Sequence, residues 1–146
     1  MSLFSGMNIS ASGMTAQRVR MDIVSQNIAN VNTTRDADGN VYSRQLVVFE
    51  EKNTTPFASV LSKTMGGRSS SGVKVTQIVK DTESEYNQVY DPSHPDADEN
   101  GYVTYSNVNT VTEMTDLIDA SRAYEANVTA FNAAKNMALK GLEVGK

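Results

Sequence analysis

Apolar residues recur every seven positions near the start of the chain, in two columns of one repeat. The first column consists of Met7, Met14, Met21 and Ile28. The second column contains Val24 and Val31. Ser10 and Gln17 interrupt the second column, so the repeat is weakest near its start. A seven-residue repeat is typical of a helix that packs against another helix. The pattern predicts a helix over residues 5–32 that stops near Asn30, because asparagine tolerates the left-handed conformation that ends many helices.

The end of the chain carries a second repeat of the same period, which predicts a helix over residues 108–143. Its apolar columns include Leu117, Tyr124, Val128, Phe131 and Leu142. Thr110 and Glu113 have the spacing of a capping box, in which two side chains bond the first free backbone N–H groups of a helix. Two terminal helices of this kind are expected to pack together as an antiparallel pair.

The segment between the helices has the short apolar runs of β-strands. Strands are predicted at 45–50, 73–80, 86–90 and 102–105. Turns or loops are predicted where Gly, Pro, Asp, Asn and Ser gather, at 36–40, 53–56, 63–72 and 91–101. The predicted fold class is therefore α+β, with long N- and C-terminal helices packing as a coiled-coil-like pair around a small β-rich insert. The corresponding domain division is 1–34, 35–107 and 108–146.

Composition narrows the function classes. The 146 residues include 13 Lys and Arg against 17 Asp and Glu, which gives a net charge of −4. Nucleic acid is therefore disfavoured as a partner, because its phosphates are bound mainly by clusters of Lys and Arg. Cysteine is absent and His94 is the single histidine, so the sequence offers neither thiolate chemistry nor a two-histidine metal site.

The apolar content is lean for a self-sufficient core. Hydrophobic residues make up 39% of the chain and tryptophan is absent, which indicates that apolar positions are arranged to meet other chains. The longest apolar run, 46–49, is far shorter than the roughly 20 residues that cross a bilayer, so no membrane insertion is predicted. Residues 1–14 lack Lys and Arg and have no continuous apolar block, so no cleaved secretory leader is predicted.

Three short motifs resemble chemical sites, and none is complete. Residues 96–101 copy the first six positions of a calcium loop, but Asn107 stands where a bidentate Glu is required. Residues 67–72 have the glycine spacing of a phosphate loop, but Val73 replaces its lysine. His94 lies between prolines, and no Gly-x-Ser-x-Gly nucleophile turn occurs. The sequence predicts no catalytic residue, cofactor or metal. The alternatives are a soluble calcium-binding or adaptor module that uses 96–101 and, with less support, a hydrolase that uses His94.

Two long segments resemble the signatures of one known family. Residues 11–33 end in Asn-Ile-Ala-Asn-Val-Asn-Thr and resemble the N-terminal signature of the bacterial flagellar rod and hook proteins. Residues 107–127 begin with Asn-Val-Asn-Thr-Val-Thr-Glu and resemble the C-terminal signature of the same axial family. Residues 72–75 and 89–103 resemble the matching segments of proximal-rod proteins, and the short insert fits these better than the larger hook proteins. The stretch 33–40 departs from the family by being longer and more polar.

The resemblance implies a structural subunit of the proximal rod of the flagellar basal body. Such subunits are exported by the flagellar type III apparatus without a cleaved leader. They assemble with copies of themselves and with rod neighbours such as FlgB and FlgF into a helical tube. That tube surrounds the export channel and transmits torque, with the terminal helices inside and the insert outside. The family has neither catalytic activity nor a cofactor.

On this interpretation, the apolar columns of both helices form the assembly interface. These residues are Met7, Met14, Met21, Val24, Ile28, Val31, Leu117, Tyr124, Val128, Phe131 and Leu142. The alternative for each of them is packing within its own chain. Both can hold together, since one helix can carry an apolar face for its own partner and another for a neighbour.

Overall fold

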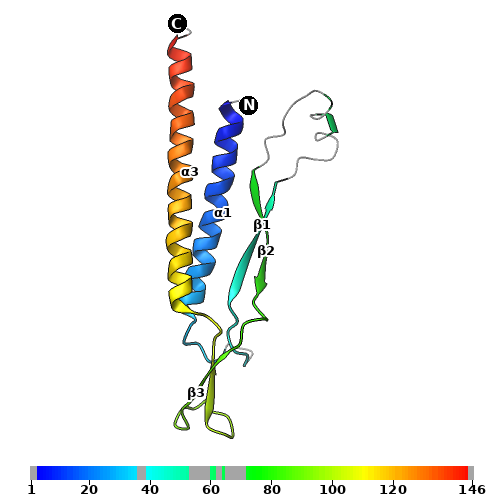
Figure 1. The fold of residues 1–146 in the computed structure, drawn as a ribbon, viewed down its shortest axis with the longest axis vertical. Coiled ribbons are helices and arrows are strands. Elements are labelled where there is room, and N and C mark those ends of the chain that lie inside the picture. Colours follow the sequence, from blue (N-terminus) through cyan, green and yellow to red (C-terminus); the bar gives the residue numbers. More distant parts are fainter. Residues whose placement is uncertain (1–2, 36–38, 53–59, 62–63, 65–71, 145–146) are drawn as a thin grey trace.

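The computed structural model describes residues 3–35, 39–52, 60–61, 64 and 72–144. Two long antiparallel helices, α1 (Leu3–Ala29) and α3 (Thr110–Val144), form an elongated stem (Figure 1). The chain between them contributes two antiparallel hairpins. One pairs β1 (Gln45–Glu51) with β2 (Val73–Lys80), and the other pairs β3 (Asn87–Tyr90) with β4 (Tyr102–Tyr105). The predicted α+β class is confirmed, whereas the division at 34/35 and 107/108 stays a prediction.

The stem is held in register by three pairs of residues along its length. A Cβ atom on Gly13 would lie only 2.7 Å from Asn127 Oδ1, so the Asn127 side chain packs directly against Gly13 there. Lower in the stem, Arg20 Nη2 donates to Asp116 Oδ1 (2.7 Å). At the base, α1 and α3 are joined by a buried hydrogen bond between two side chains. Because α3 is the longer helix, its last turns extend beyond the start of α1 (Figure 1).

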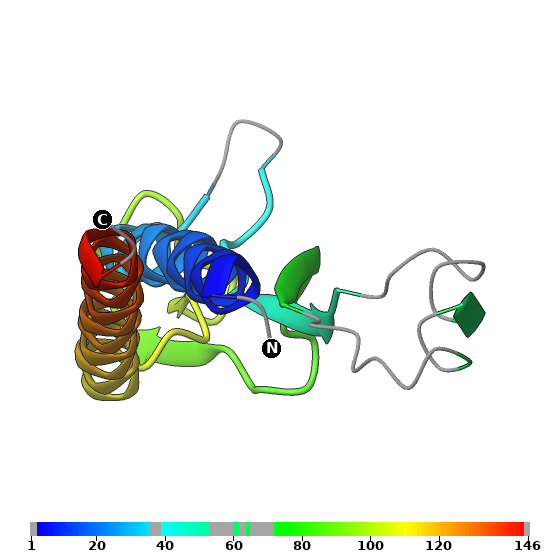
Figure 2. The same ribbon diagram turned by 90° about the horizontal axis from the view of Figure 1, so that it is seen from above.

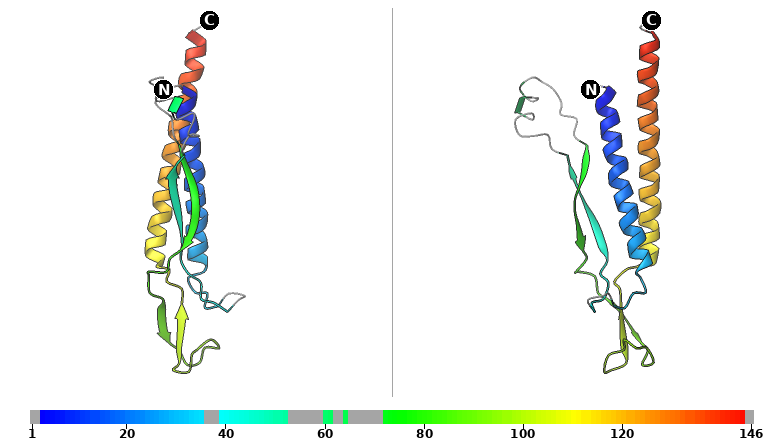
Figure 3. Two further views of the ribbon diagram at one scale, coloured as in Figure 1. Left: turned by 90° about the vertical axis from the view of Figure 1, so that its right-hand side faces the viewer. Right: turned by 180° about the vertical axis from the view of Figure 1, so that it is seen from behind.

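The β1–β2 hairpin covers a second side of α1, so α1 lies between α3 and the hairpin (Figure 2). Ser12 on α1 makes this contact. Its hydroxyl donates to Ile9 O (2.7 Å) and accepts from Val73 N (3.1 Å) at the start of β2. Gly72 is required just before Val73, because any Cβ there would collide with the Ser12 hydroxyl. The β3–β4 hairpin extends from the base of the stem, away from the chain termini (Figure 3).

The buried apolar core of the described residues is small. It consists of Ala16, Ile23, Val24, Val103, Val108 and Ala120. Two of these six are alanines, so little apolar surface is removed from water inside the chain. Many large apolar side chains are exposed instead, including Phe4, Met137 and Leu142 at the upper end of the stem. This distribution differs from that of a self-contained domain, in which most large apolar residues are buried.

The predicted capping box at the start of α3 is wrong. Asn109 is the N-cap residue, since its Oδ1 accepts from Val111 N (3.0 Å) and Thr112 N (3.3 Å). Glu113 does not turn back to the helix end but points inward, where its residue is fully buried. The physical reason is a cation elsewhere in the chain, Arg44, which binds the Glu113 carboxylate more strongly than a backbone N–H group would.

The predicted stop near Asn30 is confirmed, although not by a left-handed residue. α1 ends at Ala29 and a turn follows over 30–32. Among the described residues, only glycines have positive φ. The side chain of Asn30 instead reinforces the last turn, because Asn30 N (3.1 Å) and Asn30 Nδ2 (2.9 Å) both donate to Gln26 O.

Gly6 and Gly13 offer a matched pair of substitutions, because they occupy the same column of α1. A Cβ on Gly6 meets no atom within 4 Å, so Gly6→Ala is expected to raise the free energy of unfolding by up to about 1 kcal/mol through helix propensity. Gly13→Ala gains the same propensity but must displace the Asn127 amide, which is bonded to Ala123 O (2.8 Å). In urea unfolding followed by circular dichroism, Gly13→Ala should be less stable than Gly6→Ala by about 1 kcal/mol. Equal stabilities would contradict the close approach.

Candidate assembly surface and the polar junction at its base

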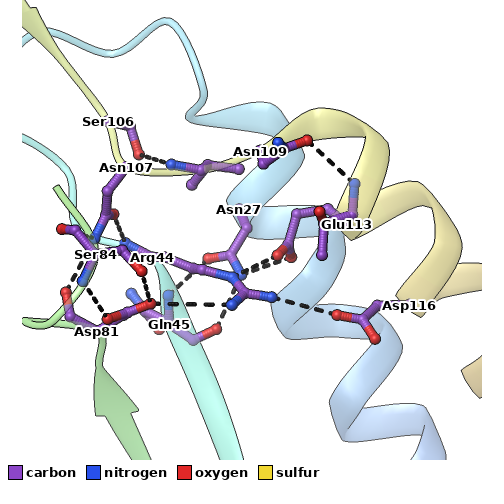
Figure 4. A network of polar contacts seen from close by, with 12 residues as sticks. Asn27, Arg44, Gln45, Asp81, Ser84, Ser106, Asn107, Asn109, Glu113 and Asp116 are labelled. Atoms are coloured by element: carbon purple, nitrogen blue, oxygen red, sulfur yellow. Dashed lines mark hydrogen bonds and ion pairs between the residues drawn. The ribbon is translucent and has the colours of Figure 1, made fainter. Parts of the chain in front are cut away.

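Arg44 lies at the centre of a cluster of charged and amide side chains where the hairpins meet the stem (Figure 4). Its Nε donates to Glu113 Oε1 (2.6 Å) and its Nη2 to Asp116 Oδ2 (3.3 Å). Its Nη1 lies 3.9 Å from Asp81 Oδ2. We call this cluster the polar junction and define it as Asn27, Arg44, Asp81, Asn107, Glu113 and Asp116. It joins both helices to both hairpins at one point.

Asn27 ties α1 to the start of β1. Asn27 Nδ2 donates to Gln45 O (2.9 Å), and Asn27 Oδ1 accepts from Gln45 N (2.9 Å), as a neighbouring strand would do. The same amide nitrogen donates to Glu113 Oε2 (2.9 Å), and the oxygen also accepts from the Tyr42 hydroxyl (2.9 Å). Burial raises the pKa of Tyr42, and the nearby Glu113 charge adds to this shift. With 1% of its surface exposed, Asn27 has every side-chain polar atom occupied.

Asn107 makes the corresponding tie on the other side of Arg44. Asn107 Oδ1 accepts from Arg44 N (2.7 Å), while Asn107 Nδ2 donates to Asp81 O (3.1 Å) and Ser84 O (3.3 Å). Hydrogen bonds from the Ser84 N–H and hydroxyl hold the pKa of Asp81 below its usual value, and Glu83 N–H and Arg44 lower it further. The loop between the two hairpins is thereby fixed to Arg44, the residue directly before β1.

The polar residues of the junction were not predicted as functional. Asn27, Asn107 and Glu113 lie in the two segments that resemble the axial signatures, but the sequence pattern assigned no contact to either asparagine and only the capping-box contact to Glu113. The available signal was the position of Asn27 on α1. It falls seven residues after Arg20 and fourteen after Gly13, in the column that faces α3. A polar residue that continues a buried column needs a buried polar partner.

The methionine column of α1 lies beside the column that contacts α3. Met7, Met14 and Met21 each follow by one position the residues Gly6, Gly13 and Arg20, so they are turned by about 100° around the helix. Ser12, one position before Gly13, contacts the β1–β2 hairpin on the opposite side. The methionines therefore lie along the edge of α1 away from that hairpin, where all three are partly exposed.

The apolar column of α3 lies on the same face of the stem. Leu117 and Val128 follow by one position Asp116 and Asn127, which contact α1. In an antiparallel pair of helices, the residue that follows a contact residue by one position lies on the same face of the pair for both helices. The two columns thus form one partly exposed apolar surface, which we call the open face. It consists of Met7, Met14, Met21, Ile28, Leu117, Tyr124, Val128 and Phe131.

The other three predicted interface residues lie elsewhere. Val24 is buried in the core, with 6% of its surface exposed. Val31 follows the end of α1 and lines a cavity of about 390 Å³ beside the β3–β4 hairpin. Leu142 is 71% exposed on the part of α3 that extends beyond α1. The assignment of all eleven residues to an assembly interface stays a prediction.

Two of the three carboxylates in the acidic loop 96–101, those of Asp96 and Asp98, make contacts within the chain. Asp96 accepts from the Thr34 hydroxyl (2.7 Å) and lies 3.2 Å from Arg35 Nε. Asp98 Oδ1 accepts from Asn100 N and Tyr102 N, both at 2.8 Å, and Gly101 has a positive φ of 78°. In the described part of the chain, no group of three or more His, Cys, Asp and Glu side chains could hold a metal ion. The loop has the geometry of an Asx turn.

The remaining motif predictions have simple outcomes. His94 Nδ1 accepts from Asp96 N (3.1 Å), and its ring makes an edge contact with Tyr105. The predicted phosphate-loop residues 67–71 and the turn 53–56 lie outside the described residues. Over the described ranges, neither helix is long and apolar enough to cross a membrane.

Comparison with known proteins identifies the family. A family model described as "Flagella basal body rod protein" matches residues 7–35, and one described as "Flagellar basal body rod FlgEFG protein C-terminal" matches residues 99–144. The chain is 48% identical to the flagellar basal-body rod protein FlgC of Bacillus subtilis, with both chains covered completely. The chain belongs to the FlgC family. It is also 43% identical to FlgC of Borreliella burgdorferi over 99% of the chain and 98% of that protein. Identity to FlgC of Escherichia coli is 36%, again over both complete chains.

The FlgC family resemblance and the polar junction involve the same segments. The first matched segment contains Asn27, and the second contains Asn107 and Glu113. Arg44 and Asp81 lie between the two segments and are brought to them by the hairpin strands. The two segments that match the family models therefore meet in the structure, because both contribute side chains to the polar junction.

Glu113→Gln tests the junction. The substitution removes the negative charge that binds Arg44 and leaves a partly buried guanidinium with weaker partners. The free energy of unfolding should fall by about 2–3 kcal/mol. Glu143→Gln is the matched control in the same helix, because it breaks only the exposed Lys140–Glu143 pair and should cost less than about 0.5 kcal/mol. Urea unfolding of the two variants measures the difference, and similar losses would argue against a dominant role for the junction.

The lowered pKa of Asp81 predicts a dependence of stability on pH. Its folded pKa lies below the ordinary value of 3.8, so the stabilisation is complete above about pH 4 and is lost as the pH falls through the folded pKa. Asp81→Asn should therefore be less stable than the unmodified chain near neutral pH, and the gap should narrow in acid. Asp22→Asn is the control, since Asp22 is exposed on α1. A gap for Asp81→Asn that is constant across the acid range, as measured by urea unfolding, would contradict this account.

Proposed function

We propose that this chain is a structural subunit of the flagellar basal-body rod, located in the basal body and without catalytic turnover. Membership of the FlgC family supports this proposal, since the relatives carry the name of a flagellar basal-body rod protein. The subunit assembles with copies of itself and with neighbouring rod proteins such as FlgB and FlgF into a helical tube around the type III export channel.

The observation that carries the proposal is the open face. Partly exposed apolar residues run along both helices, while the buried apolar core of the described residues holds only six side chains. Ordering a residue costs about 1–2 kcal/mol in conformational entropy, which must be offset by burial. Contacts with neighbouring subunits bury the open face and supply the missing stability, because any partner that binds only the folded chain stabilises it.

The long stem and the hairpins suit different positions in such a tube. We assign the terminal parts, 1–34 and 108–146, to the inner layer and the insert, 35–107, to the outer layer. The β1–β2 hairpin lies on one side of α1, and the methionine edge lies on the opposite side. A subunit built this way presents different surfaces to different neighbours. Contacts between unlike surfaces extend into a helix unless their rotation closes a ring.

Phe131→Asp tests assembly through the open face. A carboxylate at this position would be buried without a partner between subunits, at a cost of several kcal/mol for each subunit. In cells that lack the native copy, the variant should give neither motility nor rods in extracted basal bodies, although circular dichroism of the purified variant still shows helix. Ala126→Asp is the control, because it introduces the same charge at an exposed position of α3 off the open face. Motile cells with intact rods carrying Phe131→Asp would refute the proposal.

A further inference from the structure

The outer side of α3 carries a second apolar surface, separate from the open face. Val111, Met114 and Ile118 are 74%, 54% and 51% exposed, and their spacing places them on one side of the helix. Ala120 is fully buried toward the stem. Ile118 lies two positions from Ala120, or about 200° around the helix, so it faces the side opposite α1. We call these three residues the outer α3 patch.

Four charged side chains share the outer sides of the two helices. Arg20 contacts α3. Arg18 and Asp22 each lie two positions from Arg20, or about 200° around the helix, so they point away from α3. Arg122 and Glu125 lie two positions from Ala120 and Asn127, respectively, and point away from α1. All four are exposed. Within the described residues, none of these side chains makes an ion pair or hydrogen bond.

The order of these charges selects one orientation of contact. Along each helix the positive residue comes first and the negative residue follows three or four positions later. Two such helices repel when they run parallel and attract when they run antiparallel, because Arg18 then faces Glu125 and Asp22 faces Arg122. Within the chain α1 and α3 are antiparallel. Two copies standing side by side in the same orientation therefore bring α1 of one against α3 of the other in the favourable direction.

We propose that α3 of a second copy of this chain packs on the outer side of α1. Arg18 pairs with Glu125 of the second copy, and Asp22 pairs with Arg122 of the second copy. The outer α3 patch of the second copy then lies level with Ser25 and Ala29, which are exposed on the same side of α1 as Arg18 and Asp22. The proposal rests on the proposed function and identifies the surfaces through which adjacent subunits meet. Each α1 is thereby enclosed by two α3 helices, one from its own chain and one from its neighbour.

The pairing also sets an axial offset between neighbours. Inside the chain Gly13 faces Asn127, and extending this register along both helices places Arg18 level with Arg122. The proposed ion pairs instead join Arg18 to Glu125 and Asp22 to Arg122, which is a shift of three to four residues. At 1.5 Å per residue, adjacent copies are displaced by about 5 Å along the stem. A row of copies with such a displacement climbs as a helix and does not close as a flat ring.

A contact between two α1 helices is the main competing arrangement. An antiparallel α1–α1 pair would also join Arg18 to Asp22, but it leaves the outer α3 patch exposed in both copies. Its two-fold symmetry also closes the contact at two copies, whereas the contact between α1 and α3 repeats without limit. The exposed apolar area of α3 therefore favours the second copy's α3 as the occupant.

Disulfide crosslinking tests the arrangement, because the natural chain has no cysteine. The variant Arg18→Cys/Glu125→Cys places one thiol on each outer side. The two thiols cannot bridge within one chain, since a disulfide requires Cα atoms within about 7 Å and both helices lie between them. In basal bodies isolated after mild oxidation, we expect a ladder of species at multiples of the chain mass. The single variants should remain monomeric, and so should Arg18→Cys/Asp119→Cys, whose second thiol is exposed on another side of α3.

Three results would overturn the arrangement. The first is a double variant that is incorporated into basal bodies but stays monomeric, the second is a product that stops at the dimer, and the third is a product whose mass is no multiple of this chain. Absence of even the unmodified chain from basal bodies would instead refute the proposed function, and this inference with it.

Charge reversal provides a second measurement that does not depend on oxidation. Arg18→Glu and Glu125→Arg should each reduce swimming at least severalfold, because each places like charges across the contact. The double variant Arg18→Glu/Glu125→Arg restores opposite charges and should recover most of the swimming. Failure of the double variant to improve on both single variants would contradict the pairing. All of these positions are exposed in the isolated subunit, so the single variants should keep the helical circular dichroism of the unmodified chain.

Discussion

The rest of the structure depends on the partly buried ion pair between Arg44 and Glu113. These residues are 69 positions apart, and their contact decides where the hairpins attach to the stem. Burying two charges costs several kcal/mol per ion unless their remaining polar atoms are satisfied. Here the second oxygen of Glu113 accepts from Asn27, while the other nitrogens of Arg44 reach Asp116 and Asp81. An attachment shifted by even one residue would break several of these bonds together, so the junction specifies a single register.

In this molecule, the residues that define the shape of the subunit differ from those that offer apolar surface for burial. The surface between α1 and α3 is lined by small and polar residues, such as Gly13, Ala16 and Ala120, which permit a close approach but bury little apolar area. Ile23 and Val24 are buried, but many of the larger apolar residues of the helices lie on the open face or on the outer side of α3. The polar junction thus defines the shape of the subunit, whereas the apolar surface available for burial lies on its outside. This arrangement suits a chain that acquires much of its stability from neighbours.

The sequence predicted the elements of the fold because their signals are local. A seven-residue apolar repeat extends over many turns of α1 and α3, and strand alternation is visible within a few residues at 73–80. The capping box failed because Thr110 and Glu113 are compatible with it locally, and only the folded chain brings Arg44 to Glu113. The heptad repeat also could not show that α3 of the same chain faces the neighbouring column, with Gly13 and Asn27, in place of the methionines. That choice depends on contacts between residues about a hundred positions apart.

The unequal sides of the stem have a consequence for how copies associate. α1 is contacted by α3 on one side and by the β1–β2 hairpin on another, so its exposed sector faces a single remaining direction. The outer α3 patch faces a different direction, across the full width of the stem. Two apolar surfaces that differ in direction and composition cannot both be buried by a two-fold dimer, because such a dimer buries one kind of surface twice and leaves the other in water. Burying both requires a repeated contact between unlike surfaces, and a repeated contact of this kind generates an open helical array.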